Sequence, residues 1–325
     1  MNRIRLAALG AAALLAAGCS APAAHAPTAH DHTSAQAHAP APAAEAAALP
    51  SVASVPRLTT ATDRALPIAP YLLTDSQADQ LAAAQAVLTD RCMARFGFHY
   101  RTPAPAKGFR PKTPTQYRYG VTDPLAAKAD GYAPPGSRIP PPAVKRPPLP
   151  APMTLVLTGT NDSHVKPGSP QATGGEAYHG QRVPVGGCLG EARSRLLSAG
   201  PAAGGDASLA DTINVDSFED SRRDPRVKAV FAGWSACMKA RGYTYPDPLT
   251  AASDPAWDTK APSAREEAVA AADADCKQRG NVIGVWYAVD SAYQRQAIGQ
   301  HSKALAAVRT DITARLRLAA AALTG

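Results

Sequence analysis

The sequence predicts a mainly α-helical fold of two disulfide-stapled helical modules, with long Pro-rich loops and a long C-terminal helix. Three observations predict it. The nonapeptide CMARFGFHY, which begins at Cys92, returns in degenerate form as CMKARGYTY at Cys237. Apolar residues around both copies recur at helical spacing along one face. Aromatic residues make up only 6% of the chain, which has 31 prolines, so we expect a thin core and much irregular chain.

The first residues have the pattern of an export signal. Two arginines precede an apolar run over residues 6–17 that ends in LLAAGCS. Such a run is too short to remain as a membrane-spanning helix, and it is typical of a processed signal peptide. The stretch resembles the bacterial lipobox, which implies that residues 1–18 are removed and that Cys19 becomes the lipidated N-terminus. The alternative is an ordinary signal peptide cut near Ala17, which leaves Cys19 as a free thiol.

Residues 19–56 consist mostly of Ala, Pro, His, Ser and Thr. Such a segment cannot bury enough apolar surface to offset its ordering entropy, so we expect a disordered tether. Four of the eight histidines lie in it, and His30 and His32 flank an aspartate. Imidazole suits zinc or copper, which makes these two histidines weak metal candidates. A spacer without metal is the interpretation that we favour.

The first module is expected over residues 57–200. Its main helix ends shortly after Cys92, with Thr74 or Asp75 as the cap at its start and Gly97 as its stop. The apolar face of this helix comprises Leu81, Ala84, Leu88, Cys92 and Phe96.

The second module is expected over residues 201–325. Asp224 is suited to cap a helix, Pro225 to open it and Gly242 to end it. The apolar face of this helix comprises Val227, Phe231, Trp234 and Cys237.

Four cysteines remain when Cys19 is set aside for lipid, and in an oxidising compartment they predict two disulfides. Each nonapeptide has one later helical cysteine within its own module. Cys188 lies at the head of a short helix, and Cys276 lies in the last turn of a helix that Ser263 and Glu266 can open as a capping box. We therefore predict the pairs Cys92–Cys188 and Cys237–Cys276. A Cys92–Cys237 pair is the alternative.

The Pro-rich insert, residues 101–187, is expected to be largely irregular, with a helical turn or two between Tyr119 and Tyr132. A Gly/Ala/Pro joint at 199–205 is the expected module boundary. The pattern over residues 282–323 predicts a long helix that Gly284 and Gly299 can bend or break. We expect its last part to pack back on the modules, rather than to lie on anionic lipid.

No sequence motif with a catalytic mechanism is present. The chain has no G-x-S-x-G, no H-E-x-x-H, no phosphate-binding Gly loop and no Cys-x-x-Cys pair. Asp273 and Asp275 are two positions apart on a helix and should point in different directions. The chain has a net charge of +8, but it has no run of basic residues interleaved with aromatics, the pattern that marks nucleic-acid binding. We expect no enzyme activity, no cofactor and no nucleic-acid partner.

These expectations describe a lipoprotein anchored on the outer face of the cell membrane, extracytoplasmic and non-enzymatic. Its Ala-rich, Cys-paired composition is similar to that of actinobacterial lipoproteins. The expected role is to bind an envelope protein or a cell-wall polymer. The alternatives are an envelope-acting hydrolase with its site in residues 101–187, and metal binding through the His-rich tether.

Overall fold

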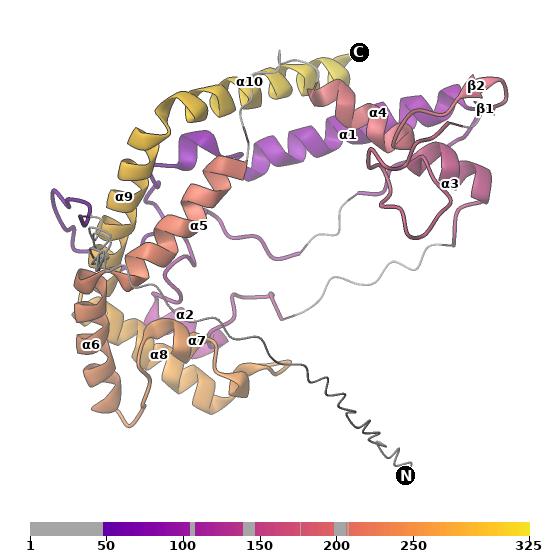
Figure 1. Cartoon of the computed structure of the whole chain (residues 1–325). Helices are drawn as coiled ribbons and strands as arrows, with labels where there is room; N and C mark the ends of the chain where they lie inside the picture. The colour runs from indigo at the N-terminus through magenta and orange to yellow at the C-terminus, as the bar shows by residue number, and fades with distance from the viewer. Residues whose placement is uncertain (1–47, 105–107, 139–146, 176, 198–205, 207) are drawn as a thin grey trace, which may run out of the picture. The chain divides into compact units, whose positions relative to one another are not determined.

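The structure is a computed structural model that describes residues 48–325, except 105–107, 139–146, 176, 198–205 and 207. The described part is mainly helical and belongs to one compact unit, which confirms the predicted fold class (Figure 1). The helices of the described part are α1 (Asp75–Arg95), α2 (Pro124–Asp130), α3 (Ala151–Thr158), α4 (Gly187–Leu197), α5 (Ser208–Arg223), α6 (Pro225–Lys239), α7 (Pro248–Ala252), α8 (Ala264–Arg279), α9 (Val282–Gln300) and α10 (Ser302–Thr324). The described part also contains two short 3-10 helices, Ala69–Tyr71 and Pro255–Trp257. A two-stranded antiparallel ribbon is formed by β1 (Ala177–Tyr178) and β2 (Gln181–Arg182).

Both nonapeptides end a helix in the same way. In the first copy Gly97 has a φ of +79°, and the Phe98 N–H donates to the Met93 carbonyl at 3.1 Å. In the second copy Gly242 has a φ of +85°, and the N–H of the next residue donates five residues back, also at 3.1 Å. This is the Schellman arrangement, in which a left-handed glycine satisfies the last carbonyls of the helix. The predicted helix ends are confirmed.

Both predicted disulfides are present. Cys92 on α1 is joined to Cys188 at the head of α4, with the Cα atoms 5.5 Å apart. Cys237 on α6 is joined to Cys276 in the last turn of α8, with the Cα atoms 5.8 Å apart. Closing loops of 96 and 39 residues stabilises the fold by about 4–5 kcal/mol each on the loop-entropy model. Such staples compensate for a core poor in large side chains.

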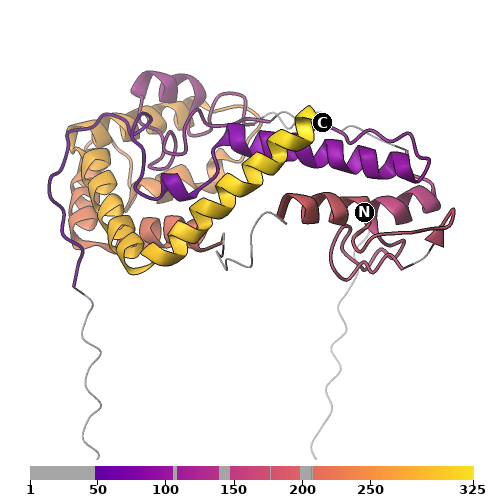
Figure 2. The same cartoon turned by 90° about the horizontal axis from the view of Figure 1, so that it is seen from above.

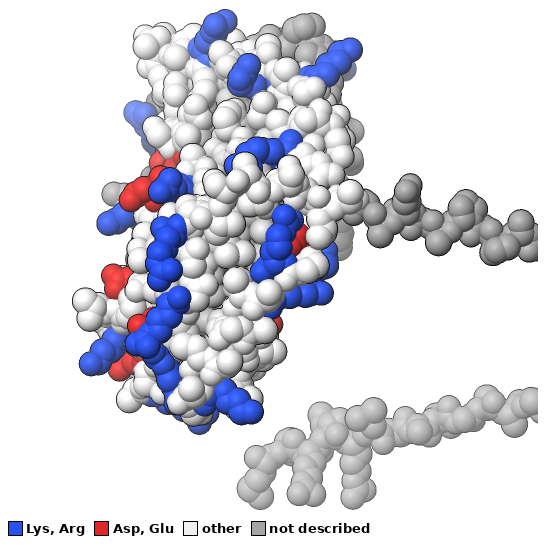
Figure 3. All heavy atoms as spheres, turned by 90° about the vertical axis from the view of Figure 1, so that its left-hand side faces the viewer, with Lys and Arg blue, Asp and Glu red and all other residues white. Residues whose placement is uncertain are grey.

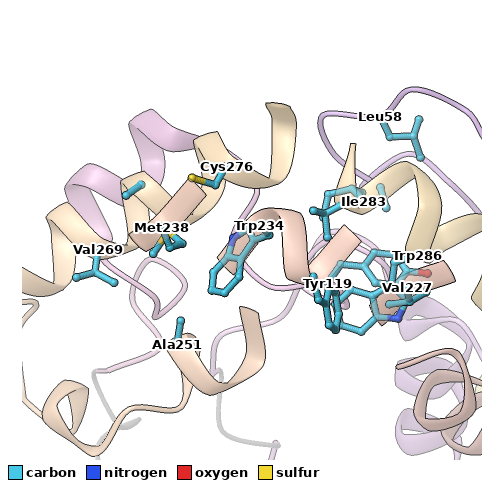
Figure 4. Packing of buried hydrophobic residues seen from close by; sticks show 14 of the residues in the cluster. Leu58, Tyr119, Val227, Trp234, Met238, Ala251, Val269, Cys276, Ile283 and Trp286 are labelled. Carbon is cyan, nitrogen blue, oxygen red and sulfur yellow. The ribbon is translucent and has the colours of Figure 1, made fainter. Parts of the chain in front are cut away.

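The core is divided into several clusters. The largest lies in the second half of the chain, where Trp234 and Trp286 are fully buried. Tyr119, from the insert, packs against Trp286 with the ring centres 5.1 Å apart (Figure 4). On α6 the core position is taken by Met238, which is buried, while its neighbour Cys237 is only partly buried. Val227, Phe231 and Trp234 are buried as predicted, and only the expectation for Cys237 is wrong.

The long C-terminal helix divides in two at His301, two residues after Gly299. Its second part, α10, lies beside α1 and packs on it and on α4 (Figures 1 and 2). Ala319 of α10 is buried among the side chains of Leu81 and Leu196. This packing agrees with the prediction for the end of the chain. It also joins elements from both sides of the boundary expected near residue 200.

The start of the described chain differs from the expected tether. The Pro50 carbonyl accepts a hydrogen bond from Arg226 Nη1 at 3.0 Å. The Pro56 carbonyl accepts one from Asn281 Nδ2, also at 3.0 Å. A Cβ at Gly284 would collide with the Pro56 carbonyl oxygen, so only glycine allows this approach. The carbonyls of Pro50 and Pro56 are thus held by side-chain donors from distant helices, which composition does not reveal. Cys19, His30 and His32 lie outside the described residues.

Candidate functional site

Residues 113–138 of the insert, called the insert segment below, contact the helices of the second half. The segment includes α2, which packs on α8. Three carboxylates on α8 and α9 are completely buried: Glu266 and Asp273 on α8, and Asp290 on α9. Each one has polar partners in or beside the insert segment. Burying a carboxylate is costly unless hydrogen bonds and a counter-charge compensate it, so these partners decide where the segment lies.

Asp290 is held by Arg118 and Tyr119. Arg118 Nε donates to Oδ2 at 2.6 Å and Nη2 donates to Oδ1 at 3.2 Å, a two-point contact. The Tyr119 hydroxyl donates to Oδ2 at 2.7 Å, and Gln294 Nε2 donates to Oδ1 at 3.1 Å. Burial, and then the Asp290 charge, raise the pKa of Tyr119 well above its usual value, so this hydroxyl remains a donor. These contacts fix the middle of the insert segment on α9.

Glu266 accepts a hydrogen bond from the Tyr132 N–H at 2.9 Å and a short one from Arg138. The capping box predicted at Ser263 is only half present. The Ser263 hydroxyl accepts from the Glu266 N–H at 3.1 Å, but the Glu266 carboxylate turns into the interior instead of back to the cap. The charge of Arg138 outweighs what a solvated capping bond can provide. The end of the insert segment is therefore fixed on the start of α8.

Asp273 forms a buried ion pair with Lys277 one turn later, at 2.9 Å. Lys277 Nζ also donates to the Val121 carbonyl of the insert segment at 3.1 Å, and Trp234 Nε1 donates to Asp273 Oδ1 at 2.8 Å. Burial raises the pKa of Asp273, and the Lys277 charge opposes that rise. Asp275 points elsewhere and pairs with arginines at the surface, as its spacing predicts. Asp273 and Lys277 are therefore both engaged in hydrogen bonds within the fold.

An open pocket lies where the insert segment meets the loop after α7. We call it the seam pocket, and its volume is about 590 Å³. Tyr132 and Trp257 lie against each other at its wall, with ring centres 6.1 Å apart. Asp258 and Lys260 are exposed at its rim. The remaining lining residues are Ala133, Arg138, Ala252, Ser253, Asp254, Pro255 and Thr259.

Part of the seam pocket is already ordered by its own hydrogen bonds. Arg138 Nη1 donates to the Trp257 and Thr259 carbonyls, each at 2.9 Å. Asp254 accepts from the Ala256 N–H at 2.9 Å and from the Tyr245 hydroxyl at 2.8 Å. These bonds, the backbone one first, lower the pKa of Asp254, so it is ionised at neutral pH. The pocket therefore offers preformed carboxylates and cations beside two aromatic rings.

A smaller pocket of about 360 Å³ lies on the other side of the same chain segment, and Ala133 lines both. Its polar lining includes Gln116, Gln278 and several threonines. Gln278 Nε2 is already bonded to the Thr122 carbonyl at 2.9 Å, and Gln116 Oε1 accepts a hydrogen bond from the Lys112 N–H. Its lining also includes the carboxylates of Asp123 and Asp130.

Both pockets are lined by polar and charged side chains together with aromatic ones. Neither pocket has a histidine or a cysteine in its lining. Across the part of the chain that the structure describes, no group of three or more His, Cys, Asp and Glu side chains has the geometry of a metal site. The seam pocket presents hydrogen-bonding groups, charged groups and aromatic rings, which are the features of a site that binds a polar ligand.

The sequence analysis did not find Asp254, Asp258 or Lys260. Trp257 is buried, with 7% of its surface exposed. The only local signal was the stretch DPAWD, an aromatic residue between two acids in a loop. The insert contributes residues to both pockets, and Ala133 lines each of them.

Among the described helices, none combines the length and apolar character needed to cross a membrane. The disulfides suggest an extracytoplasmic location, since such bonds persist in oxidising compartments. No protein-family model, no curated protein and no solved structure matches this chain.

Proposed function

We propose that the protein is a lipid-anchored extracytoplasmic binding protein that holds a saccharide segment of the cell wall in the seam pocket. The observation that supports the proposal is the pocket itself: an open volume of about 590 Å³ with Tyr132 and Trp257 at its wall and Asp258 and Lys260 at its rim. A sugar ring has an apolar face, which suits an aromatic wall, and a ring of hydroxyls, which suits charged and carbonyl partners.

The geometry of the pocket also supports a polymer over a small metabolite. The pocket is open, and its rim residues Asp258, Thr259 and Lys260 are exposed. An enclosed site buries most of a small ligand, whereas an open one leaves room for a ligand that extends beyond the pocket. A wall polymer passing over the insert segment fits such a site.

The binding test uses soluble oligosaccharides released from bacterial cell walls, titrated into the mature chain and followed by calorimetry. The double variant Asp258→Asn/Lys260→Ala should bind them at least ten-fold more weakly, because both rim charges are lost. The control Asp211→Asn/Lys166→Ala changes the same charges at exposed positions outside the pocket and should bind as wild type does. Absence of binding to the wild-type chain, or equal loss in both variants, would reject the proposal. New reducing ends in the mixture would instead identify the alternative hydrolase.

The anchor is tested separately. It rests on the resemblance of LLAAGCS to a lipobox, and several acyl chains on Cys19 would hold the protein durably. Cys19→Ala should release the protein from the membrane fraction and abolish labelling by fatty acid. A variant that stays in the membrane fraction would show that lipidation is not the main anchor.

A further inference from the structure

One face of the molecule is strongly basic. Figure 3 shows the side on which α6 and α9 lie, where Lys and Arg side chains are far more frequent than Asp and Glu. We call it the basic face. The exposed cations of the two helices are Lys228, Lys239 and Arg295, and the chain that precedes α1 adds Arg57 and Arg64 beside the exposed Asp63.

The helices of this face present no exposed acid. Within α6 there is no Asp or Glu at all, and the one acid of α9, Asp290, is completely buried against Arg118. Asp224, which caps α6, is buried and paired with Arg226 at 2.7 Å. The exposed charge of both helices is therefore entirely positive. A surface with an excess of positive charge attracts an extended anionic partner and raises its rate of encounter.

The start of the described chain lies on the same helices. Pro50 is bonded to Arg226 at the first turn of α6, and Pro56 is bonded to Asn281 at the start of α9. Tyr287 of α9 donates to the Ala65 carbonyl at 2.8 Å. The segment that leads back toward Cys19 thus approaches the folded part on its basic face.

We propose that the basic face docks on the anionic phospholipid surface of the membrane. Each Lys or Arg held near such a surface strengthens binding roughly five-fold, and the attraction weakens with salt. In this orientation α6 and α9 face the lipid headgroups. The proposal is independent of the saccharide site, since it uses none of the residues of the seam pocket.

The test measures co-sedimentation of the mature chain with vesicles. Residues 19–325 carrying Cys19→Ala are used, so that no acyl chain contributes. Binding is compared between vesicles of 30% phosphatidylglycerol in phosphatidylcholine and vesicles of phosphatidylcholine alone. We expect binding only to the anionic vesicles, with loss at high salt. The triple variant Lys228→Ala/Lys239→Ala/Arg295→Ala should lower the partition coefficient at least ten-fold.

The control is Lys112→Ala/Lys166→Ala/Arg182→Ala, which removes the same net charge from exposed positions in the first half of the chain. This control variant should bind the anionic vesicles nearly as strongly as the chain that carries Cys19→Ala alone. Equal loss in both triple variants would show an unspecific effect of net charge and would overturn the proposal. So would the absence of binding to anionic vesicles, including the case in which the chain binds a soluble polyanion such as polyphosphate instead. Far-ultraviolet circular dichroism checks that both variants are folded.

Discussion

At the scale of single residues, the described structure depends on buried carboxylates whose partners are distant in sequence. Asp290 is the clearest case, because its main partner Arg118 lies 172 residues earlier. Arg118 also has its guanidinium 4.9 Å from the centre of the Phe218 ring, so the cation is enclosed on more than one side. A buried pair of this kind adds little over an apolar pair, but its disruption leaves an uncompensated charge in the interior.

Arg118→Met should therefore lower the free energy of unfolding by about 3–5 kcal/mol, since Asp290 is left buried without its counter-charge. Chemical denaturation followed by circular dichroism measures the change. Arg110→Met is the matched control, because Arg110 pairs with Asp79 at 2.8 Å with both side chains more than half exposed. Its free energy of unfolding should be nearly unchanged, as is usual for surface pairs. Equal effects of the two substitutions would contradict the assigned role of Asp290.

At the scale of elements, the two nonapeptides share a helix end but not a helix pair. In both copies the cysteine is followed by a left-handed glycine and the same capping bonds. The partner cysteines differ: Cys188 begins α4, whereas Cys276 lies near the end of α8. The disulfides thus join different ends of their partner helices. The structural similarity between the two halves is local to the helix end.

Gly97→Ala and Gly242→Ala should each destabilise the protein by about 1–2 kcal/mol, the cost of an L side chain in the left-handed region. No atom lies within 4 Å of a Cβ built at either glycine, so the cost comes from the backbone alone. Thermal unfolding of the two variants tests this. Gly233→Ala is the control, because Gly233 lies inside α6, has ordinary φ and also has no atom within 4 Å of such a Cβ. It should stabilise the helix by about 0.5–1 kcal/mol. Destabilisation by Gly233→Ala would refute the argument.

At the scale of the whole molecule, contacts across the expected boundary near residue 200 join the two halves. The insert segment bonds to α8 and α9, and α10 packs on α1 and α4. Neither half can unfold without exposing surface or charge that the other half covers. The predicted modules are therefore expected to behave as one thermodynamic unit.

The mature chain should accordingly unfold in a single transition with its disulfides intact. All three tryptophans lie in the second half, so their fluorescence reports on that half, whereas far-ultraviolet circular dichroism reports on the helices of both. The two signals should change at the same denaturant concentration, because two-state unfolding requires coincident transitions. Separate midpoints would show that the modules unfold independently.

The sequence by itself determined the features that depend on near neighbours. Asp224 as the cap of α6 and the two glycine stops were predicted and are present, and of the two caps predicted for α1 the structure has Thr74. Helix capping is decided within a few residues, which is why pattern and spacing suffice. The disulfide pairing followed from the same reasoning, because each cysteine had only one later helical candidate in its own module.

The tertiary structure alone decided the buried carboxylates, the seam pocket and the basic face. Glu266 had the spacing of a surface capping residue and is an interior partner of Arg138, 128 residues earlier in the chain. The seam pocket exists only because Tyr132 of the insert comes to lie beside Trp257. The cations of α6 and α9 become one surface only when the two helices pack together. Side chains so far apart carry no periodicity that links them, and charge and burial select their partners only once the chain has folded.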